Sequence, residues 1–225
     1  MSNESRSPVR RAASGLLSDP QQARLSRAVR RMLRPYRIAY LGTPRRLIPV
    51  GRDFGFSRGK PIDRYYIEDF LSRQSGTSER TPGAIHGIVL EIAEDTYTRQ
   101  FGLGVERVDI LHASPDNPQS TIVGDLTDGS NLPSDTYDCV ICTQTLLVIY
   151  DVKAAIRTIH RILKPGGSAL VTVPGISQIL RPDIDSWGDY WRFTTLAARR
   201  LFEEVFEPAN VSVDSYGNVL TASAF

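Results

Sequence analysis

Apolar and polar positions alternate most regularly in the second half of the chain. Residues 138–142 form a short apolar run that begins at an acid, as buried parallel strands do. From 152 to 163 apolar residues recur at three- and four-residue steps, which gives a helix one apolar face, and Asp151 is placed to cap it. The glycines at 166–167 predict a turn before a second buried strand at 168–173. Strand, helix and strand in this order predict a βαβ unit, which requires a parallel sheet around it.

The same pattern predicts further elements on both sides of this unit. Apolar runs indicate strands, and three- to four-residue spacing with capping residues indicates helices. The predicted strands are 87–92, 107–111 and 121–126, followed near the end by 210–213 and 218–224, and the predicted helices are 20–33, 62–73 and 195–206. Strands and helices that alternate in this way predict an α/β fold.

Charge divides the 225-residue chain unevenly. Residues 1–60 contain 14 Lys and Arg but three Asp and Glu, whereas 61–225 contain 13 and 22. We therefore expect a basic, partly disordered and partly helical extension at 1–50 and a folded domain at 51–225. The extension can dock on the acidic domain, or it can bind an anionic partner. It has few aromatic residues and no recognisable nucleic-acid motif, so neither a nucleic acid nor a membrane is strongly indicated.

Two features bear on the cell compartment and on metals. The sequence has no signal peptide and no apolar run of about 20 residues, which predicts a cytoplasmic protein. Cys139 and Cys142 are spaced like a metal or redox pair, but no second cysteine pair completes a zinc site. Both fall within one predicted buried strand. We therefore expect packing roles for them and no metal.

Two motifs in the βαβ unit carry a family resemblance. The run L-K-P-G-G at 163–167 and the run Y-D-C-V-I-C at 137–142 resemble the second half of class I S-adenosylmethionine-dependent methyltransferases of the type 11-like group. The runs at 53–66 and 187–194 are similar to methyltransferase-like proteins associated with glycan or natural-product assembly. The resemblance implies a Rossmann-like sheet of seven mostly parallel strands flanked by helices. It also implies S-adenosyl-L-methionine as cofactor and a transferase role in biosynthesis.

The loop after the first strand departs from that family. Where the family has E/D-x-G-x-G-x-G, this chain has Glu91-Ile92-Ala93-Glu94-Asp95-Thr96-Tyr97. In the family the acid organises the loop and the glycines let backbone approach the cofactor. Two further acids would repel a phosphate-bearing ligand such as NAD. They are compatible with S-adenosylmethionine, whose sulfonium and amino groups are positive.

The resemblance assigns cofactor roles to individual residues. Asp109, predicted near the end of the second strand, would accept hydrogen bonds from the ribose, and His112 would lie near that sugar. Asp125 and Leu126 would contact the adenine. The helix before the first strand would cover the methionine end. The full expected set is Glu91, Ile92, Ala93, Asp109, Ile110, Asp125, Leu126, Thr143, Arg64 and Tyr65.

The acceptor side is expected from two places in the sequence. Gln144 follows the fourth strand, where the family faces the methyl group. Tyr190 and Arg192 lie in the octet W-G-D-Y-W-R-F-T, which either shapes a site for a sugar or closes the core. No histidine stands near Gln144 to act as general base. We expect methyl transfer to a hydroxyl of a small, sugar-containing or natural-product acceptor.

An alternative keeps the fold without the transfer. The glycine-poor loop is also compatible with a protein that binds the cofactor without transferring methyl, that uses it for other chemistry, or that acts as a partner protein. A homodimer or a partner enzyme is compatible with either view.

Overall fold

The computed structural model describes residues 54, 56, 59–77, 83–180, 184–218 and 221. Its strands are β1 (Gly87–Ile92), β2 (Val105–His112), β3 (Ile122–Val123), β4 (Tyr137–Thr143) and β5 (Leu163–Thr172). Its helices are α3 (Ile62–Gln74), α4 (Thr96–Phe101), α5 (Val152–Ile162), α6 (Ile184–Trp187) and α7 (Thr195–Glu203), with short 3₁₀ turns η3 (Leu146–Val148) and η4 (Pro208–Asn210). The helix predicted at 20–33 and the extension at 1–50 lie outside the described residues.

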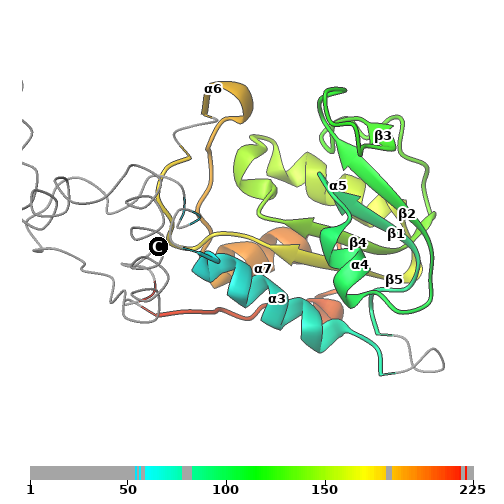
Figure 1. Cartoon of the computed structure of the whole chain (residues 1–225), viewed down its shortest axis with the longest axis horizontal. Helices are drawn as coiled ribbons and strands as arrows, with labels where there is room; N and C mark the ends of the chain where they lie inside the picture. Colours follow the sequence, from blue (N-terminus) through cyan, green and yellow to red (C-terminus); the bar gives the residue numbers. More distant parts are fainter. Residues whose placement is uncertain are drawn as a thin grey trace, which may run out of the picture. The chain divides into compact units, whose positions relative to one another are not determined.

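The five strands form one sheet in the order β3-β2-β1-β4-β5 (Figure 1). All four pairings are parallel, which confirms the predicted α/β class. The chain moves outward from β1 to β3 and then returns to place β4 on the other side of β1. The sheet therefore changes winding direction between β1 and β4, and ligands of open α/β sheets bind at such a point, beyond the carboxyl ends of the strands.

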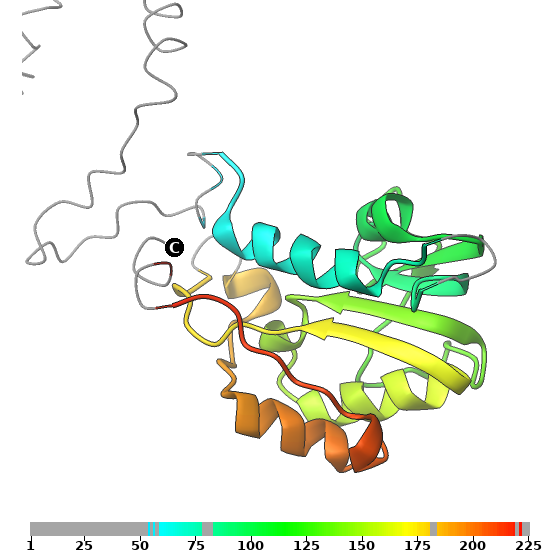
Figure 2. The same cartoon turned by 90° about the horizontal axis from the view of Figure 1, so that it is seen from below.

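The described sheet has five strands, so the expectation of seven is wrong for this part of the chain. A hairpin of strands at 210–213 and 218–224 was predicted, but residues 211–218 form neither a helix nor a strand. Tyr216 packs its ring against Tyr66 of α3 at 5.9 Å, and Arg199 of α7 donates to the Val211 carbonyl. Side-chain contacts with two helices thus hold the segment, which passes on the β5 side of the molecule (Figure 2). Residues 219, 220 and 222–225 lie outside the described residues.

The ends of three strands also differ from the predicted ones. β2 is longer than 107–111 and ends at His112, whereas β3 covers only two residues of the predicted 121–126. β5 includes the predicted glycine turn, where Gly166 has φ +83° and the pairing with β4 shifts register between Tyr137 and Cys139. The run P-G-G therefore forms an irregularity within the strand.

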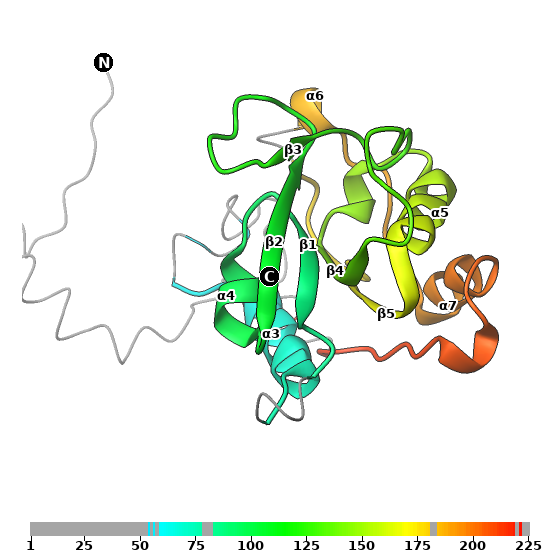
Figure 3. The same ribbon diagram turned by 90° about the vertical axis from the view of Figure 1, so that its right-hand side faces the viewer.

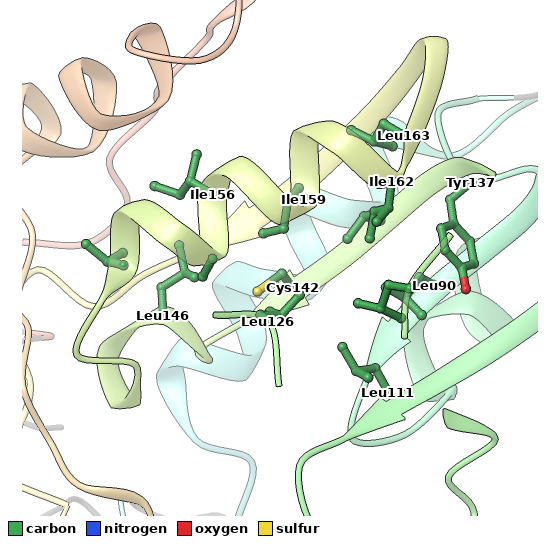
Figure 4. Packing of buried hydrophobic residues seen from close by; sticks show 14 of the residues in the cluster. Leu90, Leu111, Leu126, Tyr137, Cys142, Leu146, Ile156, Ile159, Ile162 and Leu163 are labelled. Atoms are coloured by element: carbon green, nitrogen blue, oxygen red, sulfur yellow. The ribbon is translucent and has the colours of Figure 1, made fainter. Parts of the chain in front are cut away.

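Helices cover both faces of the sheet. One apolar cluster joins α5 and α7 to Leu90, Leu111 and Val140, and the labelled isoleucines of α5 point into it (Figure 4). A second cluster joins Ile67 and Leu71 of α3 to the opposite face. Successive residues of a strand face opposite sides. Alternate residues of each buried strand therefore pack in the two different clusters.

The cysteines follow the same alternation along β4. Cys139 belongs to the α3 cluster and Cys142 to the α5 cluster, and both are free and fully buried. Burial raises the pKa of each thiol to about 12. Both cysteines are therefore uncharged packing residues on opposite faces, as predicted.

Predicted caps are present at two helices. The Asp151 carboxylate accepts from the Ala154 N–H at 2.9 Å at the start of α5. The Thr194 hydroxyl oxygen accepts from the Ala197 N–H at 3.2 Å at the start of α7. Each cap satisfies a backbone donor that the first helical turn leaves unpaired.

A glycine at the start of β1 gives the first testable prediction. Gly87 has φ +60°, and a Cβ there would lie 2.4 Å from Asp138 Oδ2, an atom that also accepts from Ile88 N–H and Lys164 Nζ. Gly104 has a similar φ of +71° but open space around it. We expect Gly104→Ala to cost about 1 kcal/mol for backbone conformation alone. Gly87→Ala should cost about 2 kcal/mol more because of the collision.

Urea unfolding of both variants measures this difference. The pair isolates the steric term, since both glycines have the same left-handed backbone. Equal losses of stability in the two variants would show that Asp138 can move aside without cost.

The part of the chain that the structure describes has no helix with the length and apolar character needed to cross a bilayer.

Candidate cofactor and acceptor site

β1 and β4, the strands on either side of the change in winding, both end in unusual backbone. Ala93 directly follows β1 with φ +72°, and Gln144 directly follows β4 with φ +49°. Residues other than glycine seldom adopt this conformation, and those that do cluster at functional sites. The two strands lie side by side in Figure 3. Their ends therefore bring Ile92, Ala93, Thr143 and Gln144, all expected site residues, to one edge of the sheet.

Glu91 organises the loop after β1 from inside the protein. Its side chain is 1% exposed, and one oxygen accepts from the Tyr97 N–H at 3.0 Å. The other accepts from the Thr98 N–H at 2.8 Å and the Thr98 hydroxyl at 2.6 Å. Burial raises the pKa of the Glu91 carboxyl, and these donors oppose that shift. Both oxygens are thus occupied by the first turn of α4, so Glu91 acts through the loop.

Ala93 stands where the family has a loop glycine, and its backbone adopts the positive φ that a glycine would favour. Its N–H donates to the Leu111 carbonyl at 2.9 Å, and its carbonyl accepts from Asn117 Nδ2 at 2.6 Å. These two hydrogen bonds hold the strained residue in place. We expect Ala93→Gly to raise the free energy of unfolding by up to about 1 kcal/mol, because the strain disappears.

Thermal unfolding measures this change, with Ala169→Gly, in the regular part of β5, as the matched control that should lose stability. A loss in Ala93→Gly as large as that in Ala169→Gly would show that Ala93 is unstrained.

The sequence predicted Asp109 near the end of the second strand, but Asp109 lies further back within β2. β2 continues for three residues beyond it, and Asp109 pairs in register with Leu90 in the middle of β1. Its Oδ2 accepts from the Tyr137 hydroxyl at 3.0 Å, and Tyr137 is the first residue of β4. The carboxylate therefore points toward the amino half of the sheet. Ile110, the next residue, is 6% exposed and belongs to the strand interior.

His112 is the last residue of β2 and takes the position that Asp109 was expected to have. Its Nδ1 lies 2.8 Å from the Ser114 carbonyl oxygen and 3.1 Å from the Ser114 nitrogen. In the tautomer that donates from Nδ1 to the carbonyl, Nε2 is an acceptor, the type of group that a ribose hydroxyl needs. The resemblance already places His112 near the ribose, and the structure shows that β2 extends to this residue.

Asp125 and Leu126 were predicted at the end of the third strand, but they lie just after β3 and face different surroundings. Leu126 is 3% exposed and packs in the α5 cluster. Asp125 is exposed, and its Oδ1 accepts from the Thr127 N–H at 2.8 Å, which shapes the turn. Of this pair, the carboxylate alone is exposed to a ligand.

Arg64 and Tyr65 are neighbours on α3, and the structure separates their roles. The Arg64 guanidinium donates to the Tyr97 hydroxyl at 2.9 Å, which brings the first turn of α3 to the loop after β1. Tyr65 is 59% exposed and its ring packs edge-on against Tyr66 at 5.8 Å. Arg64 thus joins the site, whereas Tyr65 faces solvent.

Residues 174–193, which we call the lid loop, connect β5 to α7 and include α6. Arg192 forms a bidentate ion pair with Asp189 at 2.5 and 2.9 Å and also donates to the Gln178 carbonyl. The Asp189 side chain is 3% exposed, and the hydrogen bonds from Arg192 hold the pKa of its carboxyl below the usual range. Arg192 therefore holds the lid loop in shape, and it is not placed to act on a substrate.

Aromatic contacts seat the lid loop on the carboxyl edge of the sheet. The Trp187 ring meets the His112 ring edge-on at 5.4 Å. Trp191 Nε1 donates to the Ile149 carbonyl at 2.9 Å, and the Tyr190 ring meets the Tyr150 ring at 5.4 Å. The lid loop thus spans from the end of β2 to the segment after β4. Tyr190, which is 51% exposed, lies on the β4 side.

Comparison with known proteins identifies the family. A family model described as a methyltransferase domain matches residues 82–208, which is more than half of the chain. The chain therefore belongs to the methyltransferase domain family, and it is an S-adenosylmethionine-dependent methyltransferase of the class I type. No curated protein sequence matches it.

Several solved structures are similar in part. One is the complex between the Haloferax volcanii Trm112 methyltransferase activator and a proposed methyltransferase, with 21% identity, coverage of 64% of this chain and 69% of that chain, and a TM-score of 0.49. An S-adenosylmethionine-dependent methyltransferase from Mesorhizobium loti shows 17% identity, 65% and 81% coverage, and a TM-score of 0.43. Haemonchus contortus phosphoethanolamine N-methyltransferase 2 with S-adenosyl-L-methionine shows 14% identity, 76% and 40% coverage, and a TM-score of 0.47.

The residues at the carboxyl edge fit this cofactor. Glu94, exposed in the loop after β1, matches a ligand that carries a sulfonium and an ammonium group. Arg64, on the other side of this loop, matches a carboxylate. When bound, S-adenosylmethionine supplies an electrophilic methyl group. The remaining chemistry, which is to place and deprotonate the acceptor, falls to the side chains of this chain.

Proposed function

We propose that this methyltransferase transfers the methyl group to a hydroxyl of a small acceptor, either sugar-containing or a natural-product intermediate. The observation that carries the proposal is the position of the aromatic lid loop beside the end of β4. The Tyr190 N–H donates to the Leu147 carbonyl at 2.8 Å, only three residues after Gln144. Aromatic faces with exposed polar tips beside a backbone amide suit a polyol better than a charged or purely apolar acceptor.

The cofactor would lie across the ends of β1, β2 and β4. We propose that Ala93 and Ile92 approach it through the backbone, that His112 accepts from the ribose, and that Asp125 accepts from the adenine amine. Arg64 would hold the carboxylate of the methionine end. Thr143 and Gln144 would face the reacting end from β4. Glu91 would contribute indirectly by holding the loop after β1 in its observed path.

The test is formation of S-adenosylhomocysteine from S-adenosylmethionine with a panel of acceptors. The panel includes free sugars, glycosides and phenols as hydroxyl acceptors, together with amine and carbon acceptors. We expect turnover with at least one polyol and its loss in Tyr190→Ala. Turnover only with amine or carbon acceptors would contradict the hydroxyl assignment.

We also propose that the protein acts as a homodimer or with a partner enzyme. Size-exclusion chromatography with light scattering tests this proposal.

A further inference from the structure

A large groove lies beside β5, and we call it the α3–β5 groove. Its volume is about 1530 Å³, and α3, β5, α7 and residues 211–218 line it. That volume exceeds the roughly 300–1,000 Å³ of a usual small-ligand pocket. The groove ends at the carboxyl edge, where its lining includes Asp63, Gln144, Thr172 and Phe193. The ends of β1, β2 and β3 do not contribute to it. Gln144 is therefore the point where the groove meets the proposed cofactor site.

Asp63 lines the groove, and one oxygen of its carboxylate lacks a hydrogen-bond partner in the described part of the chain. Its Oδ1 is buried and has no hydrogen-bond partner among the described residues. Burial raises the pKa of the Asp63 carboxyl, whereas the charge of Arg64 and the backbone N–H groups of Arg64 and Asp63 oppose this shift. The unpaired atom is therefore Oδ1 alone, and not the whole carboxylate. A buried hydrogen-bond acceptor without a donor destabilises a folded protein. A ligand that donates a hydrogen bond to this oxygen would explain why it is unpaired here.

The direction of α3 places this carboxylate at the reacting end of the site. Asp63 lies in the first turn of α3, next to Arg64, whose guanidinium reaches Tyr97 at the carboxyl edge. The last turn of α3 lies at the opposite edge, where the Gln74 carbonyl accepts from the Ala84 N–H just before β1. α3 therefore runs antiparallel to the strands. Its first turn lies at the carboxyl edge of the sheet, where Asp63 and Gln144 both line the groove.

We propose that Asp63 is the general base of the transfer and that its Oδ1 accepts the hydrogen bond of the acceptor hydroxyl in the α3–β5 groove. This inference rests on the proposed function. The acceptor oxygen forms its bond to the methyl carbon while the carbon–sulfur bond breaks and leaves its electron pair on sulfur. The hydroxyl proton passes to Asp63 Oδ1 and later to water. Asp63 would then take the role of general base, for which the sequence has no histidine near Gln144.

The test compares two cofactor analogues that differ only at the reacting centre. S-adenosylhomocysteine carries a bare sulfur there, whereas sinefungin carries a carbon with an amine that projects where the methyl group would be. Calorimetric titration gives the ratio of the two affinities. A carboxylate beside the methyl position pairs with the amine, so wild-type protein should bind sinefungin more tightly. Asp63→Asn should reduce the ratio at least about tenfold while changing the affinity for S-adenosylhomocysteine less than about twofold.

The matched control is Asp69→Asn, which removes an aspartate of α3 that pairs with Arg73 on the exposed side. This control should leave the affinity ratio unchanged. An unchanged ratio in Asp63→Asn would overturn the proposal. An equal loss for both ligands would overturn it too, because Asp63 would then bind the amino group that the two ligands share.

Stability supplies a second readout that needs no ligand. Since Asp63 Oδ1 has no hydrogen-bond partner within the residues that the structure describes, Asp63→Asn should unfold at or above the wild-type temperature. A variant that fails to fold would show that this oxygen does have a stabilising partner. The proposed function fails separately, if the acceptor panel yields turnover only at nitrogen or carbon while the affinity ratio responds to Asp63. If neither analogue binds wild-type protein, both inferences are wrong.

Discussion

Glu91→Gln is expected to destabilise the protein by about 2 kcal/mol and to weaken S-adenosylhomocysteine binding at least about tenfold. The carboxylate accepts three hydrogen bonds at a site that is 1% exposed. An amide nitrogen must replace one of the two oxygens, and it then faces the backbone N–H of Tyr97 or of Thr98. A buried donor without an acceptor results, and α4 loses its attachment to the loop that approaches the cofactor.

Chemical denaturation and calorimetric titration measure the two effects. Glu106→Gln is the matched control, since Glu106 is an exposed residue of β2. It should alter neither quantity. If Glu91→Gln lost stability but kept wild-type affinity, the loop after β1 would not hold the cofactor.

Asp189→Asn is expected to destabilise the lid loop by about 3 kcal/mol. It should increase the exposure of half-buried Trp191 and of Trp187, which is already 40% exposed. Removing one partner of a buried ion pair leaves the other charge uncompensated. The amide of asparagine also keeps only one acceptor oxygen, so either the Leu180 N–H or an N–H of Arg192 loses its acceptor. Trp187 and Trp191 are the only two tryptophans of the chain, and both lie in the lid loop. Their emission should therefore shift to longer wavelength in the variant while the far-ultraviolet circular dichroism stays unchanged.

The same contact predicts the pH dependence of the lid loop. The pKa of Asp189 is lower in the folded protein than in the unfolded chain, because Arg192 stabilises the charged form. Its contribution is therefore present above the ordinary aspartate pKa of about 4 and is lost as the pH falls through the lowered value. Acidification of wild-type protein should reproduce the shift of the variant. Asp185→Asn in α6 should keep wild-type emission at neutral pH, and a shift as large as that of Asp189→Asn would contradict the role of the pair.

The sequence predicted the centre of the fold well because its signals there are local. The buried runs at β1 and β4, the periodic face of α5 and the cap at Asp151 each depend on neighbours within a few residues. The outer elements depend on distant contacts. Residues 211–213 alternate like a strand, but the segment 211–218 forms no strand, and the rings of Tyr66 and Tyr216 hold it against α3.

The candidate site was predictable only where a strand end could be located. The expectation for Asp109 was wrong in position because the end of β2 is set by pairing with β1, which no local pattern contains. Arg192 has the residue type of a substrate contact, but only the folded lid loop shows that Asp189 and backbone carbonyls occupy it. Asp63 gave no signal in the sequence, since an unpaired oxygen is a property of the surrounding structure.

A crystal structure of the protein with bound S-adenosylhomocysteine would show where the cofactor lies. We expect the nucleoside across the ends of β1 and β2, with the ribose hydroxyls within hydrogen-bonding distance of His112 Nε2. We also expect that the sulfur faces Gln144 and Asp63 at the mouth of the α3–β5 groove. A nucleoside bound away from the ends of β1 and β2, or a ribose paired with Asp109 instead of His112, would contradict these assignments.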